Sequence, residues 1–567
     1  GGKYIMNAAY IEIDGRQILT YETEDGRIYQ LGSLYHTDLY EKIWAETHIS
    51  TFRHPKYFVF GIGSGSFFRA LLNVADSDAV FVVCEPDKSI YELAMSNPEL
   101  SGCLNDDRIH FMCSPSKQEL TDMIISVLYY MDVQGACICV HPNYPVLFHD
   151  EYADFNDTVS QCARRVEMMY EALRKSGRVV TDNIIYNLDR MNHQYTIDAL
   201  KEIIPPDIPL IIAAAGPSLD ASIDYLRKAK GHAFIFSVDS ALPTLMRNDI
   251  IPDMFISVDP IKELGNFIDP RVSLIPGIFP LSCNRHLFEF HSGPAFYYSY
   301  GDSLADYMAY LEKRKLPHVD ADSSVSNHAL GIGLFLQSRN IICTGLDLGY
   351  PNGMTHSSAA IMNGAAHDPE NGAIMQVPCT SGGYVETNFQ MDMYRQLFEE
   401  RISKYPDINV INTSPDGALI AHTTYMSFRD ALGKYCTGSF ALNTRNLCQQ
   451  PFNMHDFFLK VTKSQTDFLA GLQATVGKLT AVKDRTYSNE EAGVLIDACD
   501  NTFLLLNRHP ELTCLCHCIP TDVHNLSMRL YEKTDTSETI SNYIRYFEGL
   551  IDACEHLIPL EKEIFNL

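Results

Sequence analysis

The stretch PLIIAAAGPSLDASIDYLRKAKGHAFIFSVDSA, residues 209–241, decides the fold because it holds a strand, a turn, a helix and a second strand in one series. The apolar run 210–215 stops at Gly216, Pro217 and Ser218, and apolar residues then recur at helical spacing. Gly216 permits a tight turn and Pro217 presets the first helical φ. The following N–H groups, with the Ser218 hydroxyl, suit an anion at the positive helix end, so we expect this strand tip to bind a phosphate.

The same alternation of strand and helix continues through residues 205–425. Short apolar segments separated by helical stretches read, in order, LIIAAA, AFIFSV, MFISV, GIFPLS, AFYYSY, NIICTG and NVIN. Such alternation predicts an α/β fold with a doubly wound, mostly parallel sheet. In sheets of this kind ligands bind beyond the carboxyl ends of the strands, so the residues that follow each segment are candidates for a site.

Polar residues follow several of these predicted strands. They are Ser237, Asp239 and Ser240 after the second strand, Asp259 after the third and Asp347 after the sixth. Asp239 and Asp259 can accept hydrogen bonds from ribose hydroxyls or base amino groups, or hold a divalent ion. The simpler alternative for Ser218, Ser240 and Asp259 is that each caps a helix.

A serine-rich helix start and a glycine-rich loop flank the predicted strand NIICTG. The helix before it opens with Ser323, Ser324 and Ser326, and the loop after it contains Asp347, Tyr350, Thr355 and His356. Loops at such positions usually carry function, and the near-neutral pKa of an imidazole suits proton transfer. His356 is therefore the candidate base; the alternative is a histidine that only braces the loop.

A second glycine-rich turn lies in the N-terminal region. Gly61, Gly63 and Gly65 follow an apolar strand, and Glu85 ends the next strand, 20 residues after Gly65. This layout is typical of Rossmann-like sites for nucleotides or S-adenosylmethionine, although a tight turn needs glycine in any case. Because SFFRALL places two adjacent phenylalanines at the following helix start, we expect no catalytic cofactor there.

The 567 residues are too many for one hydrophobic core, and composition changes along the chain suggest several domains. We expect an N-terminal domain, 1–154, with a β-rich start and the Rossmann-like unit. A helical connector, 155–204, leads to a central domain, 205–435. After it the strand signals fade, and long amphipathic patterns predict an α-helical domain, 436–567.

The composition of the chain argues against several classes of function and location. The formal charge of −27 and the lack of any run of five basic residues argue against nucleic-acid binding. Neither a signal peptide nor an apolar stretch approaching 18 residues is evident, so we expect a cytoplasmic protein without membrane insertion. The 16 cysteines, spread through apolar segments, suit a reducing cytosol; for Cys514, Cys516 and Cys518 we favour core packing over zinc binding.

Several motifs together resemble a known family. The series GPSLD, SVDSAL, PDMFISVDP, SSVSNHAL, TGLDLGYPNGMTHSS, VETNFQMDMYRQLFEERI and VINTSPDGALI closely resembles, in this order, the motility-associated factor (Maf) family of flagellin glycosyltransferases. The likeness spans roughly 205–425. It implies a central domain similar to bacterial sialyltransferases, which use nonulosonic acids activated as cytidine monophosphate (CMP) conjugates. It also implies cytoplasmic transfer of pseudaminic, legionaminic or a related acid to Ser or Thr of flagellin.

The resemblance also suggests roles for the candidate residues. The CMP phosphate would lie on Gly216, Pro217 and Ser218. The cytidine and the rest of the nucleotide sugar would contact Ser237, Asp239, Ser240, Asp259, Ser324, Ser326 and Thr355, and the catalytic residues facing sugar and acceptor would be His356, Asp347 and Tyr350. CMP leaves readily, so no metal is obligatory, although a divalent ion is possible. The oligomeric state stays open.

Three other functions remain as alternatives. The central domain also resembles archaeal 6-hydroxymethylpterin pyrophosphokinases, in which the strand-end aspartates would hold magnesium. A non-catalytic flagellin-binding protein would use the helical tail to pair with flagellin helices. A methyltransferase would centre on the turn from Gly61 to Glu85.

Overall fold

The structure is a computed structural model of the chain, and it divides into two compact units. It describes residues 8–567 except 14–15, 33–36, 53–54, 129–134, 263, 301–302, 321–323, 366–372, 484, 486–487, 521–522, 524–525, 527–529 and 531–534. Ser323 therefore lies outside the described residues. The first unit comprises Gly1–Lys175, Leu472–Asn501 and Ile519–Ile551, and the second comprises Ser176–Gly471, Thr502–Cys518 and Asp552–Leu567.

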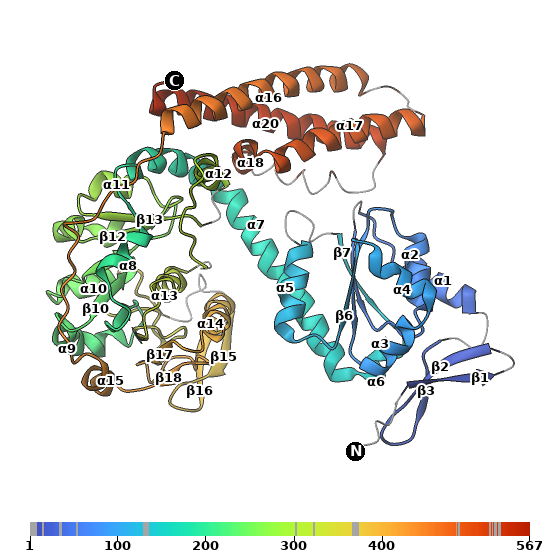
Figure 1. Cartoon of the computed structure of the whole chain (residues 1–567), viewed down its shortest axis with the longest axis horizontal. Coiled ribbons are helices and arrows are strands. Elements are labelled where there is room, and N and C mark those ends of the chain that lie inside the picture. Colours follow the sequence, from blue (N-terminus) through green and yellow to red (C-terminus); the bar gives the residue numbers. More distant parts are fainter. Residues whose placement is uncertain are drawn as a thin grey trace. The chain divides into compact units, whose positions relative to one another are not determined.

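The first unit contains two sheets (Figure 1). An antiparallel sheet is formed by β1 (Ala8–Ile13), β2 (Arg16–Glu22) and β3 (Ile28–Gln30). A parallel sheet has the order β6-β5-β4-β7, formed by β4 (Lys56–Phe60), β5 (Val80–Glu85), β6 (Ile109–Cys113) and β7 (Ala136–Val140). Around these strands, within residues 37–147, the chain forms the helices α1 (Thr37–Thr47), α2 (Ser66–Val74), α3 (Lys88–Met95), α4 (Pro98–Ser101), α5 (Lys117–Leu128) and α6 (Tyr144–Leu147). The Rossmann-like unit predicted from the sequence is present.

The second unit is built on a nine-stranded parallel sheet with the order β18-β17-β14-β9-β10-β11-β12-β13-β8. Its strands are β8 (Tyr195–Thr196), β9 (Leu210–Ala213), β10 (Phe234–Val238), β11 (Met254–Ile256), β12 (Gly277–Pro280), β13 (Ala295–Tyr298), β14 (Asn340–Thr344), β17 (Asn409–Asn412) and β18 (Thr424–Tyr425). The central strands β9 and β10 are buried along their whole length, as their unbroken apolar sequences require. The doubly wound parallel sheet is confirmed.

Helices connect these strands along the chain. They are α8 (Leu200–Ile203), α9 (Leu219–Ala229), α10 (Leu242–Arg247), α11 (His286–Phe290), α12 (Ser303–Leu311), α13 (Val325–Phe335), α14 (Phe389–Ser403) and α15 (Phe428–Tyr435). Helix α13 is buried almost throughout and packs on β9, β10 and β11. Its apolar residues on all sides explain why it lies inside the fold.

Some elements escaped the sequence analysis. The edge strands β8 and β18 have two residues each, too few for a periodic signal. An antiparallel hairpin, β15 (Ile374–Pro378) and β16 (Tyr384–Asn388), lies between β14 and α14. Its turn uses the positive φ angles of Gly382 and Gly383, a signal that could have revealed it.

The expected connector region contains most of a single long helix, α7 (His149–Met191), followed by β8 and α8. Two asparagines near its end fix the loops after β11 and β12. Asn183 Nδ2 donates to Pro260 O at 3.0 Å and to Ser282 O at 3.3 Å. Asn187 Nδ2, fully buried, donates to Leu281 O and Cys283 O, both at 2.8 Å. Amide side chains thus satisfy loop carbonyls that burial would otherwise leave unpaired.

The C-terminal region is helical, as predicted. It contains α16 (Met454–Val482), α17 (Asn489–Arg508), α18 (Pro510–His517) and α20 (Thr536–Phe565). Within the second unit, the Phe458 and Phe565 rings stack with centroids 3.8 Å apart. In the described part of the chain, no helix combines the length and the apolar character needed to cross a bilayer.

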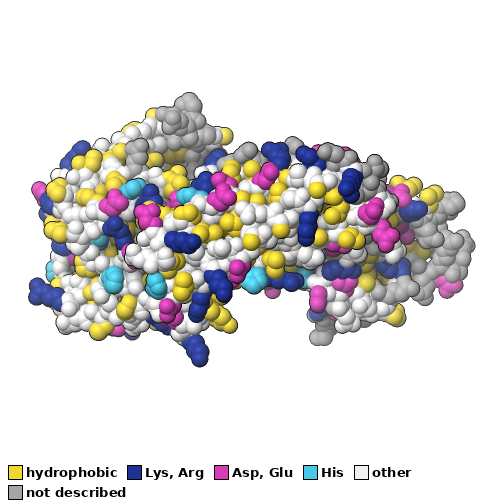
Figure 2. Space-filling model, turned by 90° about the horizontal axis from the view of Figure 1, so that it is seen from above, with side chains coloured by type: hydrophobic (Ala, Val, Ile, Leu, Met, Phe, Trp, Pro, Cys, Tyr) yellow, Lys and Arg dark blue, Asp and Glu magenta, His cyan; other side chains and the backbone are white. Residues whose placement is uncertain are grey.

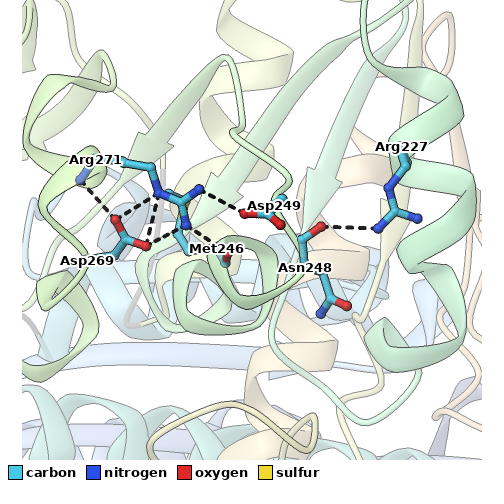
Figure 3. Close-up of polar contacts among 6 residues, drawn as sticks. All are labelled: Arg227, Met246, Asn248, Asp249, Asp269 and Arg271. Carbon is cyan, nitrogen blue, oxygen red and sulfur yellow. Dashed lines mark hydrogen bonds and ion pairs between the residues drawn. The ribbon is translucent and has the colours of Figure 1, made fainter.

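At the amino edge of the large sheet, arginines bind the end of α10 (Figure 3). Arg271 Nη2 donates to Met246 O at 3.0 Å, and Arg227 Nη2 donates to Asn248 O at 3.1 Å. Arg271 Nη1 also pairs with Asp249 at 3.0 Å. Guanidinium groups satisfy terminal helix carbonyls and oppose the negative end of the helix dipole, so these contacts secure the helix on the side of the sheet remote from the strand carboxyl ends.

Basic and acidic side chains are interspersed on the face drawn in Figure 2, and no broad basic surface is seen there. The chain has 71 acidic and 44 basic residues, and on that face side chains of both charges lie among one another. An anionic ligand of this acidic protein would therefore need a lysine or arginine within its binding site, because the surface as a whole does not attract anions.

Candidate functional site

The strand order places the candidate residues at neighbouring strand ends. The chain runs from β9 through β10, β11, β12 and β13 on one side, and then returns to β14 on the other side of β9. The carboxyl ends of β9 and β14 therefore flank a topological switch point, where open α/β sheets bind ligands. Because β14, β9, β10 and β11 are consecutive in the sheet, the turns after them lie side by side.

Asp347, after β14, contacts the Gly-Pro-Ser turn after β9. Gly216 N donates to Gly345 O at 2.8 Å, and Ser218 N donates to Asp347 Oδ2 at 2.9 Å. The Ser218 hydroxyl lies 2.8 Å from that of Ser414, after β17. The expectation that the N–H groups of this turn are free for a phosphate is wrong for Ser218, because the turn lies against a carboxylate from the neighbouring strand.

Asp347 is a buried acid with spare acceptor capacity. Its side chain is 2% exposed, and no described residue provides a hydrogen-bond partner for Oδ1. Burial raises the pKa of Asp347 to about 6, although hydrogen bonds from Ser218 and Ser414 oppose the shift. A buried carboxyl group with a raised pKa at the switch point of an open α/β sheet suits a functional role.

Asp239, after β10, is engaged by two side chains instead of being open to a ribose. Ser257 Oγ donates to Asp239 Oδ2 at 2.7 Å, and Lys262 Nζ lies 2.8 Å from Asp239 Oδ1. The aspartate is 1% exposed, whereas the lysine side chain is 20% exposed. Both carboxylate oxygens of Asp239 are therefore engaged by the protein, which does not fit the predicted direct contact with cytidine. Asp239 instead holds Lys262 at the strand edge.

Lys262 is the functional candidate that the sequence analysis missed. It follows Asp259 by three residues, in the loop after β11. Asp259 Oδ1 accepts the Ile261 N–H at 2.9 Å, and Asn284 Nδ2 donates to Lys262 O at 2.9 Å. Asp259 thus shapes the loop that carries the lysine. A basic residue just beyond a polar strand end is a signal that could have found it.

His356 is attached to the same edge through its neighbour. Ser357 N donates to Ala215 O at 2.8 Å, and the Ser357 hydroxyl lies 2.8 Å from that of Thr244, at the start of α10. Burial lowers the pKa of His356, and the nearby Lys262 ammonium lowers it further, against a hydrogen bond to the Met362 backbone. No described residue supplies a partner for the buried His356 Nδ1. A neutral imidazole of this kind can accept a proton.

Thr355 and Tyr350, two other candidates, stabilise the loop that contains His356. Thr355 Oγ1 donates to Met362 O and to Gly364 O, each at 3.2 Å, and accepts the Gly364 N–H at 2.9 Å. Tyr350 is 3% exposed, its N–H donates to Glu386 O at 2.7 Å, and burial raises the pKa of its phenol. In this structure both residues fix the loop that carries His356.

The remaining candidates differ in their surroundings. Ser237 is fully buried, and its hydroxyl donates to Val238 O at 2.9 Å. Ser240 is half-buried in the 3₁₀ turn Asp239–Ala241. Ser324 caps α13 by accepting the Asn327 N–H at 3.1 Å, and Ser326 is half-buried in the first turn of that helix. Burial keeps Ser237 from the ligand side, whereas Ser240, Ser324 and Ser326 stay predictions.

Comparisons with known proteins agree with this architecture. The family model described as 6-hydroxymethylpterin diphosphokinase MptE-like matches residues 182–353. An uncharacterized protein of Treponema pallidum (strain Nichols) is 25% identical over 174 residues, which cover 29% of this chain and 77% of that protein. The solved structure of a Maf glycosyltransferase from Magnetospirillum magneticum AMB-1 matches with a TM-score of 0.55 and 15% identity, over 98% of this chain and 92% of the other. This chain has the fold of a Maf glycosyltransferase. The fold implied by the sequence resemblance is confirmed.

In this chain the glycine-rich turn of the first unit is filled by the protein's own side chains. Gly61, Gly63 and Gly65 have positive φ, and a Cβ on Gly61 would lie 2.3 Å from the Tyr144 ring. The Tyr144 hydroxyl donates to Glu85 Oε2 at 2.7 Å and accepts the Gly63 N–H at 3.1 Å. A tyrosine thus makes the contacts that a ribose hydroxyl makes in a nucleotide site.

The phenylalanines expected to obstruct this turn have another role. Phe67 and Phe68 are buried in the core of the first unit, where Phe67 packs on Trp44 and Phe68 on Phe81. They support the sheet. The side chains that lie against the glycines are those of Tyr144 at Gly61, His141 at Gly63 and Leu100 at Gly65.

Cys514 and Cys516 lie in α18, and Cys518 follows directly after that helix. Cys514 and Cys518 are buried, Cys516 is half-buried, and Gln465 Nε2 lies 3.8 Å from Cys514 Sγ. Among the described residues no group of three or more His, Cys, Asp or Glu side chains is arranged to hold a metal ion.

Proposed function

We propose that this chain is a glycosyltransferase that moves a nonulosonic acid, such as pseudaminic or legionaminic acid, from its CMP-activated form to Ser or Thr hydroxyls of flagellin in the cytoplasm. The observation that carries the proposal is the Maf glycosyltransferase fold, which extends over 98% of the chain. The polar strand ends at the switch point of its central sheet support the same proposal.

The proposed reaction is a single inverting displacement. The acceptor hydroxyl oxygen attacks the anomeric carbon, the bond from that carbon to the phosphate oxygen breaks, and CMP leaves with the electron pair. His356 takes the hydroxyl proton, since its lowered pKa leaves the imidazole neutral at pH 7. Asp347 and the turn at Gly216 shape the donor pocket, and Tyr350 and Thr355 keep the His356 loop in position.

The pterin diphosphokinase alternative is less well supported, although the matching family model carries that description. Its magnesium would need strand-end aspartates that are free to coordinate it. Asp239 is instead paired with Lys262, and Asp347 is buried against the N–H of Ser218. Incubation with ATP and 6-hydroxymethylpterin tests this alternative, and formation of AMP would favour it.

Intact mass of flagellin tests the main proposal. Flagellin is co-expressed with this chain and the enzymes that make the CMP-activated sugar, and then weighed by mass spectrometry. We expect additions equal to whole nonulosonic acid residues, lost when this chain is omitted or carries His356→Ala. Flagellin of unmodified mass, in cells shown to contain the CMP-sugar, contradicts the proposal.

A further inference from the structure

Lys262 is presented at the switch-point edge by a small set of buried groups. Its ammonium lies 2.8 Å from Asp239 Oδ1, and the other oxygen of that carboxylate accepts the Ser257 hydroxyl at 2.7 Å. Asp239 is 1% exposed, so its charge is held in place by the core of the sheet. The lysine side chain is 20% exposed and keeps ammonium protons that Asp239 does not use.

Its surroundings favour an anion over a neutral ligand. His356, close enough for the Lys262 charge to lower its pKa, is bound to the end of β9 through Ser357. Among the strand-end side chains described above, Lys262 alone is a lysine or arginine. An anion on the Gly-Pro-Ser turn would also lie near the carboxyl group of Asp347, so it would need a cation opposite that group.

We propose that Lys262 is the anion-binding residue of this site, that Asp239 and Ser257 are the positioning residues that hold it, and that its ligand is an anionic group of a nucleotide-activated acidic sugar. Such a donor has two anionic groups, the phosphate and the sugar carboxylate. The inference rests on the proposed function and deepens it. If the phosphate is the group bound, Lys262 also stabilises the negative charge that the phosphate gains as CMP departs.

Calorimetric titration of the full chain with three separate probes tests the inference. CMP carries the phosphate, N-acetylneuraminic acid carries the carboxylate, and cytidine carries neither. The variants are Lys262→Met, Lys262→Arg and a matched control, Lys230→Met. Lys230 pairs with Asp253 at the amino edge of the same sheet, so the control removes a similar ion pair away from the site.

We expect Lys262→Met to weaken the binding of one anion by about 10- to 100-fold, the loss typical of a hydrogen bond between charged groups. Cytidine affinity stays at the wild-type level, Lys262→Arg restores part of the affinity, and Lys230→Met binds as the wild type does. Loss of CMP binding identifies the phosphate as the group bound, and loss of N-acetylneuraminic acid binding identifies the carboxylate. Wild-type affinity of Lys262→Met for both anions overturns the inference, as does a wild-type chain that binds neither.

Asp239→Asn tests the positioning role. If Asp239 acts through Lys262, the double variant with Lys262→Met binds the anion no more weakly than Lys262→Met alone; additive losses overturn this part. Flagellin transfer, measured in parallel, separates the two proposals. If anion binding depends on Lys262 but the wild-type chain transfers no sugar, the inference stands and the proposed function is wrong. If Lys262→Met binds both anions and transfers sugar as the wild type does, the proposed function stands and the inference is wrong.

Discussion

His356 has surroundings suited to a proton acceptor. It is half-buried, its Nδ1 is buried without a partner among the described residues, and burial lowers its pKa. Those conditions keep the imidazole neutral at pH 7, because burial disfavours its charged form.

Replacement of His356 by Ala therefore separates chemistry from donor binding. We expect CMP affinity close to that of the wild type and a transfer rate roughly 10²- to 10⁴-fold lower, the usual contribution of general acid-base catalysis. Mass spectrometry of flagellin beside calorimetry with CMP measures both. Full transfer by this variant would assign the base to another group, and lost CMP binding would place His356 on the donor side.

Asp347 gives a prediction about pH. Its folded-state pKa of about 6 exceeds the ordinary value of 3.8. Between these values the folded chain binds more protons than the unfolded chain, so this group lowers stability as pH rises from about 4 to about 6, by about 3 kcal/mol in all. Asp347→Asn removes the dependence. We expect the melting temperature of the variant, relative to the wild type, to rise across this range and then level off; a constant difference would show that Asp347 ionises normally.

At the scale of elements, the turn from β9 into α9 depends on close packing against β14. A Cβ on Gly216 would lie 2.3 Å from Asp347 Oδ2 and 2.6 Å from Gly345 O. Neither atom can retreat easily, because Asp347 is buried and the Gly345 carbonyl accepts the Gly216 N–H.

Gly216→Ala should accordingly destabilise the second unit by about 1–3 kcal/mol, the usual cost of overpacking, and weaken CMP binding. Gly433→Ala is the matched control. It lies within α15 with open space around the added Cβ, so we expect a small stabilisation, about 0.5–1 kcal/mol. Calorimetric melting and CMP titration of both variants are the measurements. Equal behaviour of the two would mean that the turn tolerates a side chain.

At the scale of the whole molecule, the two units use a similar strand-turn-helix design differently. In the second unit the carboxyl edge presents Lys262 and His356, whereas in the first unit the Tyr144 ring lies against Gly61 and its hydroxyl donates to Glu85. We expect no saturable binding of S-adenosylmethionine or NAD by the first unit in calorimetric titration. Binding that is required for transfer would show that Tyr144 moves aside.

The same tyrosine should be a stability determinant. Tyr144→Phe leaves Gly63 N–H and Glu85 Oε2 without this partner, at a cost of about 1–3 kcal/mol for buried polar groups. The chain has one tryptophan, Trp44, in the first unit, so its fluorescence during urea unfolding reports on this unit. Tyr40→Phe, at a side chain 50% exposed, is the control. Equal midpoints for the two variants would contradict this role.

The sequence by itself determined the elements and their class. Apolar runs such as 210–215, the turn residues Gly216 and Pro217 and the helical spacing after them are local signals, read over a few residues. They predicted the parallel sheet and pointed to its carboxyl edge. The short strands β8 and β18 escaped because two residues carry no period.

Only the tertiary structure decided which polar groups meet. Asp347 reaches Ser218 across 129 residues of chain, and Lys262 reaches Asp239 across 23. The sequence marked Asp347, Ser218 and Asp239 as polar strand ends, but it did not show that one carboxylate would occupy the turn and the other would hold a lysine. The physical reason is that hydrogen bonds and ion pairs between distant residues depend on strand order and side-chain direction, which local patterns of polarity do not contain.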